Sequence, residues 1–259
     1  MKNLKKILNS LITDVYKIDL LRTSIVLLRF IYLYYIRKKI RFHIDTDKKI
    51  NEHITINKNN QKHTVVSHNM HFVEDLKNLR GAFRKFDGSK TVSITYPLKS
   101  IDFIDYENYK ILSVGPRNEG ELYLLRSLGF NWKNINAIDL LSYSDKIDLG
   151  DIHKTNYSDN SFEIIICGWV ISYSNDFEKI LDEMFRITKD KGIISIGFTY
   201  VPKSIDTFRK FDSDKIIEST EQIVKKYQNN IENIYFNFDA KNLYPNERRH
   251  SIIILRIKK

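Results

Sequence analysis

From Tyr109 onward, short apolar runs alternate with segments in which apolar residues recur at helical spacing. This alternation is typical of βαβ units that build a parallel sheet. It predicts an α/β domain whose last two strands follow one another as a terminal pair. The expected strands cover 111–115, 135–139, a short run before Gly150, 162–167, 193–198, 231–238 and 251–257. Two of the expected helices cover 119–128 and 204–228. A third is expected to begin at a capping box formed by Asn175 and Glu178 and to end at a C-terminal cap at Gly192. The apolar stripe of this third helix consists of Phe177, Ile180, Leu181, Met184 and Phe185.

The chain length of 259 residues suits one large domain, or a domain of common size with an extension. Its hydrophobic fraction of 42% and charged fraction of 29% are those of a globular protein. Cys167 is the only cysteine, which excludes an intramolecular disulfide framework and a multi-cysteine zinc site. We therefore expect a reducing, cytoplasmic location and a small buried apolar role for Cys167.

Most of the net charge of +10 belongs to the N-terminal segment, because residues 1–50 hold 12 Lys and Arg against 4 Asp and Glu. Apolar residues recur at helical spacing from Leu4 to about Phe42, which predicts one long or two shorter helices. Such an extension either packs on the domain or lies as a basic amphipathic helix on an anionic membrane through residues 1–42. The apolar stretch 25–36 is interrupted by Arg29 and is too short to span a bilayer.

A basic run without a recognised nucleic-acid module does not predict specific nucleic-acid binding. Residues 45–63 are polar and predict a linker or an exposed hairpin. The histidines at 53, 63, 68 and 71 lack a carboxylate or cysteine that would complete a tetrahedral set, so we expect surface histidines and no metal. The predicted organisation is an extension and linker over 1–60 and a catalytic domain over 61–259.

Chemistry in a doubly wound sheet is expected outside the carboxyl ends of the strands. Residues 111–122 predict a strand, a turn at Gly115 and the opening of a helix, where backbone N–H groups bind anions. Asp139 ends the second strand, where an acid can accept both hydroxyls of a ribose. Asp151 follows the next apolar run and is either a contact to the exocyclic amine of an adenine or a turn-forming aspartate.

These features occur in a stretch, about 109–201, that resembles the class I S-adenosylmethionine-dependent methyltransferases, in particular the type 11-like group. Residues 157–166 resemble the family's D-x-S-F-D entry into its fourth strand. Residues 178–196 resemble its E-x-x-R helix and fifth strand, with Glu183, Arg186 and Gly192 at the matching places. The resemblance implies a Rossmann-like fold: a mostly parallel seven-stranded sheet with helices on both faces, the seventh strand being inserted antiparallel.

The same resemblance implies S-adenosylmethionine as cofactor and assigns residues to its parts. Asp139 would bind the ribose, Asp151 the adenine amine and Ile152 its ring. Gly168 and Trp169 would lie beside the methionine part and the substrate. The turn departs from the family's E-x-G-x-G-x-G and resembles a G-P-R-x-E variant, in which Arg117 would pair with the methionine carboxylate and Glu119 would take the amino group. The predicted cofactor-binding set is Gly115, Pro116, Arg117, Glu119, Gly120, Asp139, Leu140, Asp151, Ile152, Gly168 and Trp169.

The expected reaction is methyl transfer to a small-molecule or glycan-like acceptor. Since a sulfonium is already activated, the protein mainly aligns the reactants. A general base helps only where the acceptor must lose a proton, and His153 and Tyr173 are the candidate catalytic residues. The alternatives are a turn histidine and a core or pocket-lining tyrosine. A non-catalytic scaffold that keeps this fold and uses its N-terminal helix on a membrane or partner is the rival reading. The oligomeric state stays open.

Overall fold

The computed structural model describes residues 19–39, 41–42, 55–56, 62–63, 91–116, 118–174, 176–203 and 216–259. The sequence predictions that fall on residues 4–18, His53, His68, His71, Arg117, Asn175 and 204–215 lie outside these ranges.

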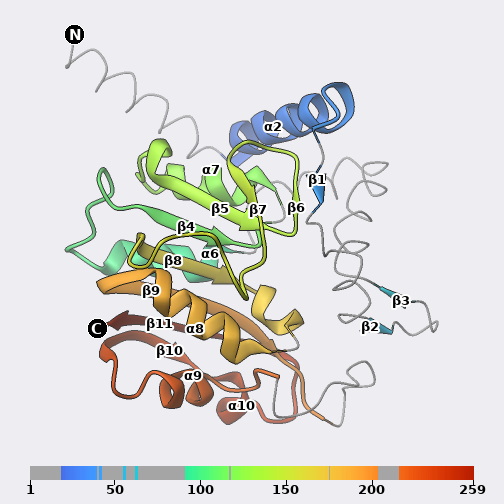
Figure 1. Ribbon diagram of the computed structural model, residues 1–259. Helices are drawn as coiled ribbons and strands as arrows, with labels where there is room; N and C mark the ends of the chain where they lie inside the picture. The colour runs from blue at the N-terminus through green and yellow to red at the C-terminus, as the bar shows by residue number, and fades with distance from the viewer. Residues whose placement is uncertain are drawn as a thin grey trace.

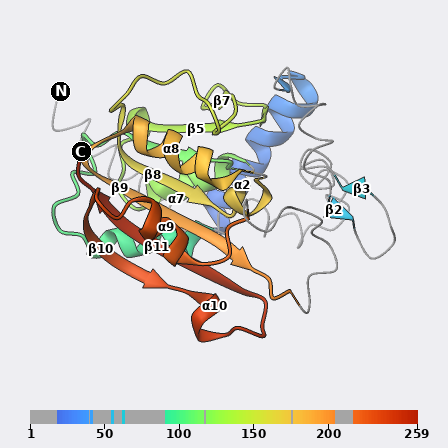
Figure 2. The same ribbon diagram turned by 60° about the horizontal axis from the view of Figure 1, so that its bottom comes forward.

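A seven-stranded sheet forms the centre of the described fold, with the strand order β10-β11-β9-β8-β4-β5-β7 (Figure 1). Strands β7, β5, β4, β8 and β9 pair in parallel, whereas β11 is antiparallel to both of its neighbours. The last strand of the chain is therefore inserted beside β9, as predicted, and Figure 2 shows β10 and β11 at the side of the sheet away from β7. The strands are β4 (Ile111–Val114), β5 (Ile135–Asp139), β7 (Ile147–Leu149), β8 (Phe162–Gly168), β9 (Thr188–Tyr200), β10 (Ile231–Phe238) and β11 (Arg249–Ile257).

The central strands are apolar on both faces because each face is covered. Side chains alternate across a strand, so Leu112 and Val114 of β4 enter one core cluster and Ile111 enters the other. Ile164 and Ile165 of β8 divide in the same way. A continuous apolar run such as 164–167 is thus the signature of a strand buried between two layers.

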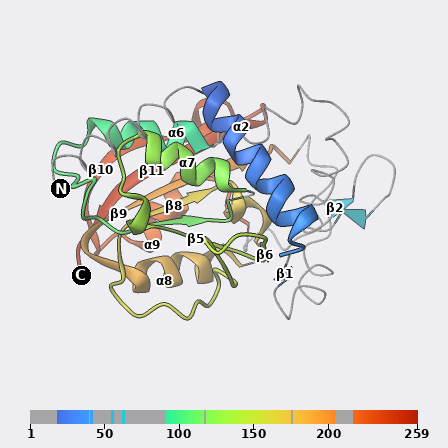
Figure 3. The same ribbon diagram turned by 90° about the horizontal axis from the view of Figure 1, so that it is seen from above.

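Helices cover both faces of the sheet, as predicted (Figure 3). The helices α8 (Phe177–Ile187) and α9 (Thr220–Lys226) lie on one face, and α2 (Asp19–Phe30), α6 (Val92–Thr95) and α7 (Glu119–Ser127) lie on the other. The predicted stripe of α8 faces the core, where Phe177, Ile180, Leu181 and Met184 are buried and Phe185 packs against them. The short helix α10 (Ala240–Leu243) is part of the connection from β10 to β11 along the chain.

The N-terminal helix ends earlier than predicted. α2 continues as a π-helical segment, η1 (Ile31–Ile36), and β1 (Arg41–Phe42) then pairs antiparallel with β6 (Leu141–Ser142). Strands β2 (Thr55–Ile56) and β3 (Lys62–His63) pair as the expected hairpin. The apolar periodicity did not reveal this stop, because the residues that leave the helix are themselves apolar or long basic side chains.

Several predicted helix boundaries were wrong, among them that of the helix predicted over 204–228: residues 216–219 are not helical, and α9 covers Thr220–Lys226. Asp176 caps the start of α8, where its side chain accepts the Lys179 N–H, so the helix begins one residue later than the predicted cap implied. α8 ends at Ile187, and Gly192 lies inside β9 instead of capping a helix. The chain enters β9 early because Thr188 already pairs with Phe162 of β8.

Candidate functional site

Three neighbouring strands end side by side at the carboxyl edge of the sheet. Val114 of β4 pairs with Ile138 of β5 on one side and with Cys167 of β8 on the other. The residues that follow, Gly115, Asp139 and Gly168, therefore occupy adjacent positions along this edge. The chain proceeds from β4 to β5 and β7 in one direction and to β8 and β9 in the other, so this edge is the switch point where ligands of doubly wound folds bind.

Gly115 makes a tight turn that depends on the absence of a side chain. Its φ of +65° is in the left-handed region, and its N–H donates to the Ile138 carbonyl over 2.8 Å. A Cβ atom at this position would lie 2.0 Å from Cγ2 of Val170, in the segment after β8. The turn after β4 and the segment after β8 are thus in direct contact. Pro116 is buried next to the turn.

The helix that follows the turn satisfies its first N–H groups from within the protein. The side chain of Asn118 caps α7 by accepting the Gly120 N–H over 2.8 Å. The Glu119 N–H donates to the Tyr143 hydroxyl over 2.9 Å. Sequence reasoning missed the cap, although Asn at the position before a helix is a usual signal for one. These two N–H groups donate to oxygens of the protein itself, whereas the sequence predicted that N–H groups at this turn bind an anion.

Glu119 has a different use from the one predicted. Its side chain is fully buried and takes a bidentate pair of hydrogen bonds from Arg29 of α2, at 2.8 and 3.0 Å. The Ser144 hydroxyl donates to the same carboxylate over 2.5 Å. These hydrogen bonds raise the pKa of Arg29 above its ordinary value, against the opposing effect of burial. The carboxylate expected to take the cofactor's amino group thus ties the N-terminal helix to the start of α7.

Asp139 lies at the end of β5, as predicted, and is partly exposed. Its carboxylate accepts the Leu141 N–H over 3.2 Å, and its carbonyl accepts the Gly150 N–H over 3.0 Å. Leu140, the next residue, is also partly exposed, whereas Ile152 is 6% exposed and packs into the core. The structure therefore places a carboxylate and apolar side chains at the same edge, on β5 and just after β7.

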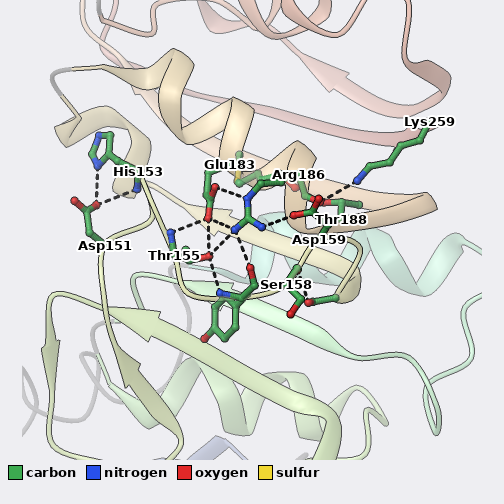
Figure 4. A network of polar contacts seen from close by, with 12 residues as sticks. Asp151, His153, Thr155, Ser158, Asp159, Glu183, Arg186, Thr188 and Lys259 are labelled. Carbon is green, nitrogen blue, oxygen red and sulfur yellow. Dashed lines mark hydrogen bonds and ion pairs between the residues drawn. The ribbon is translucent and has the colours of Figure 1, made fainter.

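Asp151, His153 and Ser174 form a hydrogen-bonded relay between two loops. The Nδ1 atom of His153 lies 2.7 Å from the Asp151 carboxylate, which also accepts the His153 N–H (Figure 4). The Nε2 atom lies 2.7 Å from the Ser174 hydroxyl. Both ring nitrogens of the candidate base therefore have protein partners, and the ring fixes the Asp151 carboxylate. Sequence reasoning did not find Ser174, which lies on the loop after β8.

Trp169 follows β8 in a conformation that is uncommon for a bulky residue. Its φ is +64°, its N–H donates to the Gly197 carbonyl over 2.7 Å, and its ring lies 4.3 Å from that of His250 on β11. Such outliers concentrate at functional sites. Tyr173, the other aromatic candidate, is 41% exposed a few residues later. Cys167 is buried, as predicted, and burial raises the pKa of its thiol to about 12.

The loop that leads into β8 is held by a network of charged hydrogen bonds centred on Glu183 (Figure 4). The Glu183 carboxylate accepts the N–H and the hydroxyl of Thr155 over 2.7 and 2.6 Å. Arg186 donates to both carboxylate oxygens of Glu183, at 2.9 and 2.7 Å, and to the Tyr157 carbonyl over 2.8 Å. Two residues that carried the family resemblance thus serve the structure of this loop.

We expect the Glu183 network to weaken in acid. Burial alone would raise the pKa of Glu183, but hydrogen bonds from Arg186 and Thr155 lower it to about 2. A lowered folded-state pKa stabilises the fold above the ordinary pKa of 4.5, and this contribution, about 2–3 kcal/mol, is lost as pH falls toward 2. Urea unfolding at a series of pH values should show the loss in the native protein and a flatter profile in Glu183→Gln. Glu178→Gln, on an exposed position of the same helix, is the control; an unchanged slope in Glu183→Gln would contradict the assignment.

The described part of the chain has neither a metal-binding cluster nor a membrane-spanning helix. No group of three or more His, Cys, Asp or Glu side chains there is arranged to hold a metal ion. None of the helices in the same ranges has the length and apolar character needed to cross a bilayer.

The strand order, with its inserted antiparallel last strand, is that of a class I methyltransferase fold. A sequence model described as a methyltransferase domain matches residues 127–196, from the end of α7 to β9. The match confirms the resemblance to S-adenosylmethionine-dependent methyltransferases of the type 11 group over this range. It includes Asp139, Asp151 and Gly168 and does not reach the turn at Gly115.

Several solved structures are similar to this chain at low identity. A putative S-adenosylmethionine-dependent methyltransferase from Listeria monocytogenes is 12% identical, with 66% of this chain and 100% of that chain covered and a TM-score of 0.46. The CurJ carbon methyltransferase is 12% identical over 66% of this chain and 54% of that one, with a TM-score of 0.47. The PH0226 protein from Pyrococcus horikoshii OT3 is 12% identical over 64% and 89%, with a TM-score of 0.44. No curated protein sequence matches significantly.

Proposed function

We propose that this protein is an S-adenosylmethionine-dependent methyltransferase that acts on a small-molecule or glycan-like acceptor. The observation that carries the proposal is the register that sets Gly115, Asp139 and Gly168 side by side at the switch point of the sheet. The match to a methyltransferase domain over residues 127–196 supports the same reaction class. We further propose a cytoplasmic location, supported by the single reduced thiol of Cys167, which is buried.

The chemistry of the side chains at this edge fits an adenosyl group. The partly exposed Asp139 offers a carboxylate to two ribose hydroxyls, and Ile152, which is mostly buried, would meet a flat ring with the small part of its side chain that reaches the surface. Asp151 offers a carboxylate that His153 holds in one orientation, suited to an exocyclic amine. When bound, the cofactor supplies a methyl group on an activated sulfonium. The departure from the expected set is Glu119, which is committed to Arg29.

In this mechanism the protein binds, orients and excludes water. Asp139 and Asp151 fix one end of the adenosyl group, and the contact between Gly115 and Val170 joins the turn after β4 to the segment after β8. Trp169 contributes a flat apolar surface on the acceptor side. Alignment of the two reactants supplies most of the acceleration for such a transfer. His153 positions Asp151, and its Nε2 atom is already hydrogen-bonded to the Ser174 hydroxyl.

Replacing Asp139 by asparagine tests the proposed ribose contact. Asparagine keeps an oxygen that accepts the Leu141 N–H, and it removes the charge that strengthens hydrogen bonds from the ribose hydroxyls. Calorimetric titration with S-adenosylmethionine should show affinity at least about tenfold weaker, since charge-assisted hydrogen bonds contribute about 1.5–3 kcal/mol each. The control is Asp145→Asn, six positions along the chain. The native Asp145 side chain is 82% exposed, so this change also removes one negative charge and should leave the affinity unchanged. Equal affinities for Asp139→Asn and the native protein would refute the assignment.

A further inference from the structure

The N-terminal helical segment, α2 followed by η1, presents an apolar face to the outside of the domain. Within the described ranges, seven of the thirteen exposed large hydrophobic side chains fall in its seventeen residues from 20 to 36. They are Leu20 (66% exposed), Leu21 (43%), Leu28 (67%), Ile31 (37%), Tyr32 (47%), Tyr35 (44%) and Ile36 (66%). Scattered apolar side chains are normal on a protein surface, but a continuous apolar patch marks a binding site. We call these seven residues the outer face.

The opposite side of the same helix is anchored in the core. Val26 and Phe30 are buried against the cluster that includes α7, and Phe30 packs edge to face on Tyr143. At about 100° per residue, Leu28 projects to the side opposite Val26 and Phe30. A helix that is apolar on both sides is usually covered on both sides. The core therefore holds this helix in place through its inner side, and the outer face exposes apolar side chains where a solvated helix would expose polar ones.

Basic residues follow the outer face directly. Arg37 and Lys38 are exposed at the end of η1. Lys39 pairs with Asp145, and Arg41 donates to Ser142 and to the Ser144 carbonyl. The first fifty residues carry 12 Lys and Arg against 4 Asp and Glu. An apolar face bordered by positive charge is complementary to an anionic lipid surface, where apolar side chains enter the interface and cations meet the headgroups.

We propose that the outer face docks on the surface of an anionic lipid bilayer, with α2 lying in the plane of the interface. Tyr32 and Tyr35 fit this location, because an amphipathic ring is favoured where apolar and polar regions meet. A second copy of the chain fits less well, because both copies would bring a net positive N-terminal segment to the contact. The Arg29 pair with Glu119 fixes the docking helix to the start of α7, at the carboxyl edge of the sheet.

Co-sedimentation of the full chain with lipid vesicles tests the proposal. We expect binding to phosphatidylcholine vesicles that contain phosphatidylglycerol, weaker binding without the anionic lipid, and a decrease as salt is added. Leu20→Gln combined with Leu28→Gln should lower the partition coefficient at least about tenfold, because both apolar side chains leave the interface. Leu243→Gln, 59% exposed on α10, should bind like the native protein. Arg37→Gln combined with Lys38→Gln should remove the preference for anionic lipid.

The alternative occupants give different results. If the native chain fails to bind anionic vesicles, or if the double leucine variant binds equally well, the proposal is wrong. Sedimentation equilibrium that shows a native dimer and a monomeric double leucine variant would assign the outer face to a second copy. A large fall in the melting temperature of that variant would assign it to a covering segment of the chain itself. Each of these outcomes overturns lipid docking.

Discussion

Replacing Arg29 by alanine should destabilise the domain by about 2–3 kcal/mol, because it leaves the buried Glu119 carboxylate without its cation. Removing one partner of a buried ion pair costs more than the pair contributes, since the remaining charge stays desolvated. Arg29 itself is 44% exposed at its side chain, so the penalty falls mainly on Glu119. The midpoint of urea unfolding measures this loss.

A double-mutant cycle separates the pair from other effects of each substitution. Glu119→Gln should also destabilise, because Arg29 and Ser144 lose an acceptor with full charge. The double variant Arg29→Ala/Glu119→Gln should cost less than the sum of the two single changes, since it removes both charges together. Lys39 and Asp145 supply the control, because this pair also joins the N-terminal segment to the domain but is exposed at both ends. Such pairs contribute about 0–1 kcal/mol. A cost for Arg29→Ala no larger than for Asp145→Ala would contradict the account.

Replacing Gly115 by alanine should lower the free energy of unfolding by about 2–4 kcal/mol, because it adds backbone strain and overpacking at the same position. An alanine there adopts a φ of +65° and places its Cβ 2.0 Å from Val170 Cγ2. Val170 follows the strained Trp169, so it has little freedom to move away. We expect the same change to weaken S-adenosylmethionine binding, because the added Cβ displaces the turn after β4 or Val170 after β8, and the proposed site lies at these strand ends.

Gly129→Ala distinguishes strain from crowding. Gly129 has a φ of +109°, but the nearest atoms to an added Cβ are 3.9 Å away on Tyr106. Its substitution should cost only the backbone term, about 1–2 kcal/mol. Combining Gly115→Ala with Val170→Ala should recover part of the loss by removing Cγ2. If Gly115→Ala costs no more than Gly129→Ala, the contact with Val170 is unimportant.

The sequence predicted the sheet well because each central strand is a short apolar run bounded by polar residues. The bounds of β5 were predicted to the residue, and the inserted last strand followed from the family resemblance. Gly192 misled the prediction of a helix end, because a glycine after a helical pattern also suits a strand. The helix ends earlier because Thr188 pairs with β8, and hydrophobic periodicity carries no information about that pairing.

The site was less predictable because its side chains form hydrogen bonds with residues that are distant in sequence. Asp139 and Gly168 could be placed from strand ends alone. The partner of Glu119 is 90 positions away on α2, and that of His153 is 21 positions away on a loop. Neither spacing has a local signature, so the residue types suggested ligand contacts where the fold uses structural ones.

Calorimetric titration of the native protein with S-adenosylmethionine, repeated with S-adenosylhomocysteine, tests the central claim most directly. We expect saturable one-to-one binding of either ligand, with the site at the ends of β4, β5 and β8. Thermal stabilisation should accompany it, reaching several kcal/mol at ligand concentrations far above the dissociation constant. Absence of heat and of stabilisation at millimolar ligand would contradict the account and leave a methyltransferase fold that serves as a scaffold.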